Sequence, residues 1–243
     1  MSYLRKVFPY AVLLFIAGSC VTKDNAHKER NVRPGINDRF KETLDVDEWI
    51  GRFEGESREI YKHRQAIVDS LGLRFGMDVA DIGAGTGFFT LLFADRVGQA
   101  GRVYAVDIAR DFLEHIELQA KEKRLTNIET ILNKDDSAEL PPTSIDLAFI
   151  CDTYHHFEYP RTMMRSIHRA LRPGGEVVVV DFHRSEANIA HLKPERQSWI
   201  RGHVRADQEQ FIREIKESGF EFVSEVPEIP LRENYVIRFR KVL

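Results

Sequence analysis

The sequence predicts an α/β fold, a doubly wound, seven-stranded and mostly parallel sheet that ends in a C-terminal antiparallel hairpin. Two observations lead to this prediction. Between residues 78 and 182, short and continuously apolar runs alternate with segments of helical spacing, which is typical of parallel strands covered on both faces. After residue 219, two further apolar runs follow each other without a helix between them, which favours an antiparallel pair at the edge of the sheet.

The chain divides into four segments. Residues 1–20 form a leader, and residues 21–39 are polar without an apolar period, which predicts a linker. Residues 40–72 carry apolar side chains at helical spacing, interrupted near Gly51 and Gly55, and predict two helices, the second over about 57–71. Residues 73–243 form the main domain.

The elements of the main domain follow from its apolar pattern. Strands are expected over 78–83, 102–108, 128–133, 145–152, 175–182, 220–229 and 234–242. Helices are expected over 87–98, 111–125, 159–171 and 207–218. The sequence "LRPGG" before the fifth strand predicts a turn, in which Gly174 and Gly175 reverse the chain.

The leader has the layout of an export signal. Arg5 and Lys6 precede an apolar stretch from Ala11 to Ala17, and small residues precede Cys20. The apolar stretch is shorter than the roughly 20 residues that span a bilayer. The sequence "AGSC" resembles the lipobox of bacterial lipoproteins, with Ala17 where Leu is usual, and this resemblance implies a membrane-anchored or exported protein lipidated at Cys20. If the leader is not processed, the alternative is an N-terminal helix of a cytoplasmic protein.

Composition excludes several classes of function. The net charge of −3 gives no electrostatic footprint for nucleic acid, so no nucleic-acid partner is expected. The two cysteines, Cys20 and Cys151, are too few for a disulfide scaffold, a cysteine-type zinc site or an iron–sulfur cluster.

The sequence "VADIGAGTGFFT" over residues 79–90 predicts the ligand-binding loop, because it joins the first strand of the sheet to its helix. Its glycines, Gly83, Gly85 and Gly87, are spaced GxGxG, whereas a dinucleotide fingerprint would need glycine in place of Phe88. The lysine of a phosphate-binding loop is missing as well. Asp81 just before the glycines suits a ligand that carries an ammonium group better than it suits a pyrophosphate.

Two more acidic positions follow the next strands. Asp107 ends the second strand, where an acid can bind a ribose diol. Asp135, Asp136 and Ser137 follow the third strand, where a carboxylate can accept a hydrogen bond from the amino group of adenine. An amine, a diol and an adenine amino group, without a phosphate, together describe S-adenosyl-L-methionine.

With the segments "VADIGAGTGFFT", "VYAVDI", "NKDDSAELPPTSIDLAFICDTYHHF" and "RALRPGGEVVVVDF", the chain from about residue 60 onward resembles class I S-adenosylmethionine-dependent methyltransferases of the small-molecule type, similar to the ubiquinone/menaquinone C-methyltransferase-like proteins. The resemblance implies a Rossmann-like sheet with N-terminal lid helices, including Trp49, Phe53, Arg58 and Tyr61. It also implies a cofactor site built from the glycine loop and three acidic strand ends. The implied cofactor-binding residues are Asp81, Gly83, Ala84, Gly85, Thr86, Gly87, Asp107, Ile108, Asp135, Asp136, Ser137 and Asp152. Asp136 is favoured over Asp135 for the adenine amino group.

Catalytic groups are expected after the fourth strand, where the methyl acceptor would meet the cofactor. The candidates are Asp152, Tyr154, His155 and His156. Asp152 is also expected at the methionine end of the cofactor. His183 and His203 could approach the His–His pair at the pocket mouth, but the sequence has no local ligand spacing, and it predicts no metal site. The stretch from residue 184 to 207 is expected to form a second cover over the acceptor.

The predicted function is transfer of a methyl group to a small-molecule or lipid-like acceptor by in-line displacement. A leader on such an enzyme favours a lipid-like or quinone-like acceptor. Two alternatives stay open: a non-catalytic, membrane-anchored module that binds S-adenosylmethionine, and, disfavoured by the glycine spacing, an NAD-dependent oxidoreductase.

Overall fold

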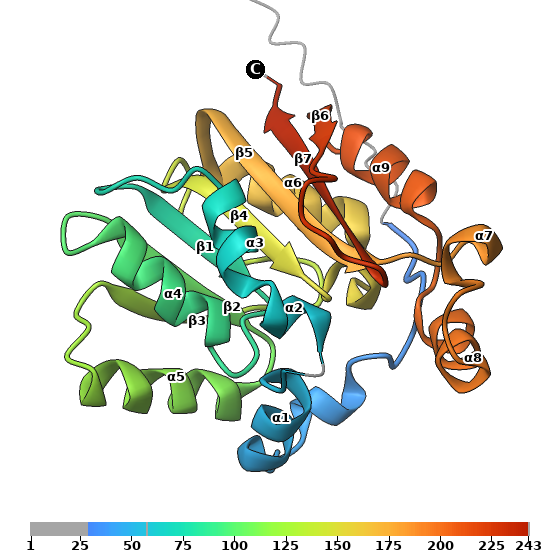
Figure 1. The fold of residues 1–243 in the computed structure, drawn as a ribbon. Coiled ribbons are helices and arrows are strands. Elements are labelled where there is room, and N and C mark those ends of the chain that lie inside the picture. Colours follow the sequence, from blue (N-terminus) through green and yellow to red (C-terminus); the bar gives the residue numbers. More distant parts are fainter. Residues whose placement is uncertain (1–28, 57, 243) are drawn as a thin grey trace, which may run out of the picture.

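The computed structural model describes residues 29–56 and 58–242, and it shows a seven-stranded sheet between two layers of helices (Figure 1). The strands are β1 (Asp78–Ile82), β2 (Arg102–Asp107), β3 (Ile128–Leu132), β4 (Ile145–Cys151), β5 (Leu171–Phe182), β6 (Phe220–Glu225) and β7 (Asn234–Lys241). The α-helices are α1 (Val46–Phe53), α2 (Glu59–Lys62), α3 (Arg64–Ser70), α4 (Phe88–Val97), α5 (Arg110–Glu122), α6 (Pro160–Ala170), α7 (Glu186–Ile189), α8 (Pro194–His203) and α9 (Gln208–Lys216). Two 3-10 helices are η1 (Asp38–Lys41) and η2 (Tyr154–His156).

The sheet has the order β3-β2-β1-β4-β5-β7-β6, which confirms the predicted fold class. Strands β1 to β5 are parallel, and β7 runs antiparallel to both β5 and β6. The order reverses between β1 and β4, so the carboxyl ends of these strands open a crevice at one edge of the sheet. The predicted C-terminal hairpin is present, with β7 inside the sheet and β6 at its edge.

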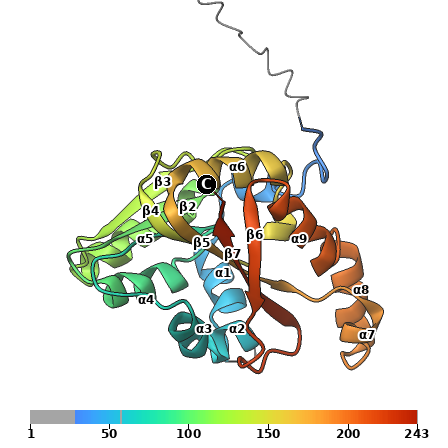
Figure 2. The ribbon, with the colours of Figure 1, turned by 90° about the horizontal axis from the view of Figure 1, so that it is seen from above.

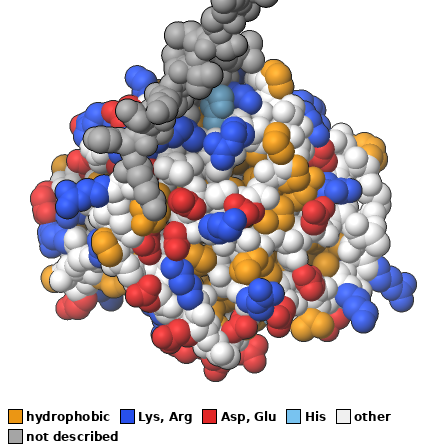
Figure 3. All heavy atoms as spheres, turned by 180° about the vertical axis from the view of Figure 1, so that it is seen from behind, with side chains coloured by type: hydrophobic (Ala, Val, Ile, Leu, Met, Phe, Trp, Pro, Cys, Tyr) orange, Lys and Arg blue, Asp and Glu red, His pale blue; other side chains and the backbone are white. Residues whose placement is uncertain are grey.

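Both faces of the sheet are buried, as its apolar strands require. Val79, Val103 and Phe149 pack in one cluster with residues of α3 and α4, whereas Ala80, Val106 and Ile150 belong to the cluster that contains residues of α6 and α9. Figure 2 shows α3 and α4 on one side of the sheet and α6 and α9 on the other. Helix α5 packs its Leu113 and Ile116 against Ala105, beside α4. The surface seen in Figure 3 carries acidic and basic side chains interspersed, in keeping with the small net charge.

The N-terminal elements differ from the prediction in two places. The helix expected over 57–71 is two short helices, α2 and α3, because His63 between them has left the helical conformation (φ −98°, ψ 12°). The linker expected over 21–39 is packed on the domain from residue 29 onward. Glu29 accepts the backbone N–H groups of Arg161 and Thr162 at the start of α6, and Asn37 is buried.

The leader, residues 1–20, lies outside the described residues. Within the described residues, no helix has the length and apolar character needed to cross a membrane.

Glu59 in α2 connects the N-terminal helices to the C-terminal strand. Its carboxylate accepts the backbone N–H groups of Arg232, Glu233 and Asn234 at 2.7 to 2.8 Å. Arg232 and Glu233 directly precede β7 and Asn234 is its first residue, so Glu59 fixes where that strand enters the sheet. Asn234 is also a neighbour of the crevice, which makes this connection relevant to the site.

We expect Glu59→Ala to lower the free energy of unfolding by about 1 to 3 kcal/mol, because three backbone donors lose a charged acceptor. Urea titration followed by circular dichroism measures the change. Glu56→Ala is the matched control, since Glu56 is exposed and its pair with Arg64 lies on the surface. Equal midpoints for the two variants would contradict this role of Glu59.

Candidate active site

A cavity of about 640 Å³ lies at the carboxyl ends of β1, β2, β4 and β5. Its walls come from the glycine loop, the strand ends, the segment from Asn37 to Phe53, and α8, and α1 and α8 lie to either side of this edge in Figure 1. The volume is in the range of small-molecule sites. The position agrees with the binding crevice expected from the strand order.

The glycine loop contributes Gly83 and Gly85 to the cavity wall. Gly83 has φ +74°, and a Cβ there would come within 2.3 Å of the side chain of Thr153. Gly87 has φ +81°, and its Cβ would come within 2.5 Å of Ile116, so this glycine serves packing under α5. Ala84, Thr86 and Gly87 do not line the cavity, and the hydroxyl of Thr86 donates to Glu54 at 2.7 Å.

Asp107 lines the cavity together with Ile108, as the sequence predicts. Its two carboxylate oxygens accept the backbone N–H groups of Gly85 and Ala109, each at 2.8 Å. Burial raises the pKa of Asp107 to about 6, against the opposing effect of these hydrogen bonds. The oxygens keep lone pairs toward the cavity, so the carboxylate suits the two hydroxyls of a ribose.

Asp81 occupies a different position from the one predicted. It is 3% exposed, it does not line the cavity, and it accepts the hydroxyl of Thr90 at 2.7 Å behind the glycine loop. Burial raises the pKa of Asp81 to about 7, and the neighbouring charge of Asp107 adds to this effect. Because Asp81 lies behind the glycine loop, it does not reach a ligand amine in the cavity, and the predicted direct contact is corrected.

Asp152 directly follows β4 and lines the cavity. Its carboxylate forms an ion pair with Arg58 and accepts the side-chain N–H of Asn234 at 2.5 Å. The backbone of Asp152 is left-handed, with φ +49°, which turns the side chain back toward the cavity. Burial raises the pKa of Asp152, while the Arg58 guanidinium opposes the shift. This group joins the N-terminal helices, β4 and β7 at the site.

At the end of β3, Asp135 lines the cavity and Asp136 and Ser137 do not. Asp135 pairs with Lys41 of η1 at 2.8 Å, whereas the side chain of Asp136 is exposed. Asn133 and Lys134 line the same part of the cavity. Of the two acids, Asp135 is the one whose side chain the structure places at the cavity wall.

The four candidates after β4 separate into two groups. Asp152, His155 and His156 line the cavity. Tyr154 is fully buried in the core, where its hydroxyl donates to Glu214 at 3.2 Å, so the prediction that it acts on an acceptor is corrected. In η2 the side chain of Tyr154 lies in the core, whereas those of His155 and His156 line the cavity.

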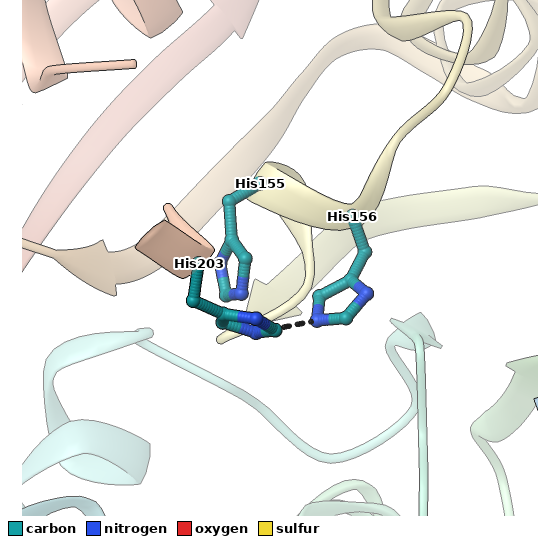
Figure 4. Close-up of side chains that lie close together, drawn as sticks. All are labelled: His155, His156 and His203. Atoms are coloured by element: carbon teal, nitrogen blue, oxygen red, sulfur yellow. Dashed lines mark hydrogen bonds between the residues drawn. The ribbon is translucent and has the colours of Figure 1, made fainter. Parts of the chain in front are cut away.

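The two histidines contact residues from distant segments. His155 donates from Nδ1 to Asp181 at 2.8 Å, and His156 contacts Asn37 through Nδ1 at 3.1 Å. Nε2 of His156 lies 3.2 Å from Nε2 of His203 (Figure 4). Burial and the nearby histidines lower the pKa of His156 to about 2, and burial lowers that of His203 to about 4. Both rings are therefore neutral at pH 7.

Aromatic side chains from two covers enclose the cavity. Trp49 and Phe53 of α1 line it, whereas Tyr61 stacks on Phe88 outside it. From the second cover, Arg196 and Trp199 of α8 reach the cavity, with the guanidinium 4.4 Å from the indole ring centroid. The sequence predicted both covers, and the structure shows which of their residues line the cavity.

Sequence reasoning missed several wall residues, among them Asn37, Arg39, Phe182 and Asn234. Asn37 and Arg39 belong to a segment read as a linker, and only Phe40 beside them carried an apolar signal. Asn234 had a usable signal, because the first residue of a strand antiparallel to β5 lies at the carboxyl end of β5.

Residues 80–179 match the family described as "Methyltransferase domain". A demethylmenaquinone methyltransferase from Geobacillus sp. (strain WCH70) is 26% identical over 124 residues, which are 51% of this chain and 53% of the relative. A ubiquinone/menaquinone biosynthesis C-methyltransferase from Pseudoalteromonas translucida (strain TAC 125) is 32% identical over 127 residues, 52% of this chain and 50% of the relative. The chain thus spans about half the length of the curated relatives it matches.

Solved structures share the fold. A SAM-dependent methyltransferase from Aquifex aeolicus has a TM-score of 0.67 at 20% identity and covers 82% of this chain and 100% of its own. The [4+2]-cyclase SpnF has a TM-score of 0.60 at 17% identity, covering 74% of this chain and 81% of its own. At these identities the likeness concerns the fold alone.

Asp81 generates a prediction about stability and pH. Because its pKa is about 7 in the folded protein and near 3.8 in an unfolded chain, its stabilising contribution is complete below pH 4 and is lost as the pH rises through 7. We expect Asp81→Asn to be more stable than the unmodified protein at pH 8, by roughly 2 to 4 kcal/mol, and to show a flatter pH dependence between pH 5 and 8.

Denaturant titrations at pH 5, 6.5 and 8 measure this difference. Asp95→Asn, which neutralises an exposed carboxylate on α4, is the control and should follow the unmodified protein. If the free energy of unfolding had the same pH dependence in all three proteins, ionisation of Asp81 would not destabilise the folded protein, and the prediction would be wrong.

Proposed function

Residues 80–179 match the methyltransferase domain family, and from this match we propose that the chain transfers a methyl group from S-adenosyl-L-methionine to a small-molecule or lipid-like acceptor. One observation carries the proposal: a single cavity joins the glycine loop and Asp107 at one end to aromatic and imidazole side chains at the other. The first end suits the cofactor, and the second suits an apolar acceptor.

The residues at the first end fit the cofactor. Asp107 accepts the ribose hydroxyls, Ile108 packs on the adenine, and Gly83 and Gly85 allow close approach to the backbone. Arg58 supplies a cation for the carboxylate of the methionine part. When bound, S-adenosylmethionine supplies an electrophilic methyl group on a positively charged sulfur. The buried carboxylates of Asp81, Asp107 and Asp152 stabilise that positive charge.

The second end holds the acceptor in line with the methyl group and excludes water. Phe40 lies beside His156, and Phe182 and Trp199 lie beside His155 and His203, where they provide flat apolar surfaces for a ring. His155 and His156 orient a polar group of the acceptor. Because the pKa of His156 is about 2 and its two ring nitrogens face Asn37 and His203, we do not assign it removal of a proton from the acceptor.

The acceptor we favour is an apolar, ring-containing molecule of the quinol type. The aromatic walls support this choice, and so do the quinone names of the two relatives. A lipid-like acceptor also explains why the chain would carry a leader with Cys20, which would keep the domain at a membrane surface where such acceptors are concentrated.

The cofactor site is tested by calorimetric titration of the full chain with S-adenosylmethionine, S-adenosylhomocysteine and NAD. We expect both adenosyl ligands to bind and NAD not to bind. Asp107→Ala should weaken adenosyl binding by about 10- to 100-fold, because two hydrogen bonds to a carboxylate are lost. Asp95→Ala is the control for loss of an exposed carboxylate.

Turnover is then measured as release of S-adenosylhomocysteine with a soluble quinol analogue and with quinol in vesicles. Release with either supports methyl transfer, and release with vesicles alone supports the lipid-like acceptor. Binding without turnover on any acceptor would favour the non-catalytic module. Binding of NAD in place of the adenosyl ligands would favour the oxidoreductase.

A further inference from the structure

Three imidazole rings converge at the acceptor end of the cavity (Figure 4). His155 and His156 come from η2, and His203 is the last residue of α8, so segments 47 residues apart in sequence meet here. One nitrogen from each ring lies within 4.8 Å of the others. The remaining hydrogen bonds of these rings show which nitrogens point into the centre of the group.

The protons on two of the rings are fixed by their partners. Nδ1 of His155 faces a carboxylate oxygen of Asp181, which can only accept, so this nitrogen carries the proton. Asn37 donates its amide N–H to the carbonyl of His156 at 3.0 Å, so its amide oxygen accepts from Nδ1 of His156. In each of these two rings Nε2 is therefore the nitrogen that can bind a ligand at the centre of the group.

Hydrogen bonds among the three rings leave one ring nitrogen without a partner. If His203 carries its proton on Nε2, it can donate to His156, whose Nε2 is 3.2 Å away. Nε2 of His155 is then still buried without a partner among the described residues, at a cost of about 1 to 3 kcal/mol. A bound cation would accept lone pairs from all three rings.

We propose that His155, His156 and His203 bind a divalent transition-metal ion of the zinc type. Three imidazoles with an open fourth position are a common zinc ligand set, and imidazole also suits copper, iron and nickel. Two imidazole nitrogens that share a tetrahedral zinc ion lie about 3.3 Å apart, close to the contact between His156 and His203. Asp181 behind His155 is the outer carboxylate that such ligands usually have.

The surroundings indicate what the fourth position takes. Arg39 lines the same cavity and lies over the ring of Phe40, which itself contacts His156, so positive charge is already present beside the group. With a metal ion added, an anionic oxygen is the favoured fourth ligand. On the proposed function, this oxygen belongs to the acceptor, such as a phenolate, which the ion would hold and activate by lowering its pKa.

The fold brings His203 into this group and leaves His183 out. His183 contacts Asn188 through Nδ1 at 3.0 Å and is not part of the imidazole group. The sequence predicted no metal because the ligands lack local spacing; α8 supplies the third ligand by folding back over the cavity. His183 is thus a matched control, as a half-buried histidine on the same second cover.

The test uses the full chain, stripped with a chelator and titrated with Zn²⁺ and Co²⁺, without cofactor or acceptor. We expect one ion per chain and the visible absorption of tetrahedral Co²⁺. His203→Asn should weaken binding by about 100-fold or more, and Asp181→Asn by about 10- to 100-fold, whereas His183→Asn should not change it. Circular dichroism confirms that each variant is folded.

No saturable binding to the unmodified chain, or equal binding to the His203→Asn and His183→Asn variants, would overturn the metal site. His156→Gln gives the same test if a variant at 203 fails to fold. Because these titrations contain neither cofactor nor acceptor, a negative result leaves the proposed methyl transfer untouched. Equally, metal binding would stand if S-adenosylmethionine failed to bind.

Discussion

The strand-end residues of the site depend on one constraint: the carboxyl ends of parallel strands lie at the same edge of a sheet. Asp107, Asp152 and Phe182 end or follow β2, β4 and β5 and meet there. Because the strand order reverses between β1 and β4, the helices that follow them leave on opposite faces and the crevice stays open. The N-terminal segment and α8 then close this crevice from two sides, which makes one cavity from segments far apart in the sequence.

The electrostatics of this edge follow from the same geometry. Asp81, Asp107 and Asp152 are all buried or nearly so, and burial raises the pKa of each. Arg58 is the cation that directly pairs with one of them. Because burial disfavours the charged form of a carboxylate, such a group of buried acids is unfavourable by itself and would be favoured by a positively charged ligand nearby. The neutral side chains of His156 and His203 at the other end of the cavity add no charge of their own.

Local pattern was sufficient for the sheet and insufficient for its covers. The strands and the loop around Gly83 could be predicted because burial on both faces and left-handed backbone each restrict the residues that fit. Asp81, Tyr154 and Asp136 were assigned from chain position, and their side-chain directions depend on Thr90, Glu214 and solvent, none of which is a neighbour in sequence. Asn37 and His203 reach the site only through tertiary packing, so no periodicity could reveal them.

The position of β7 has a consequence for how the chain folds. Strand β5 is complete at Phe182, yet its partner β7 begins at Asn234, after α7, α8, α9 and β6. During synthesis the ribosome therefore exposes β5 with an open, valine-rich edge while some fifty residues are still to come. That edge is a ready template for pairing with another nascent chain. This exposure follows from the topology and is independent of anything bound in the cavity.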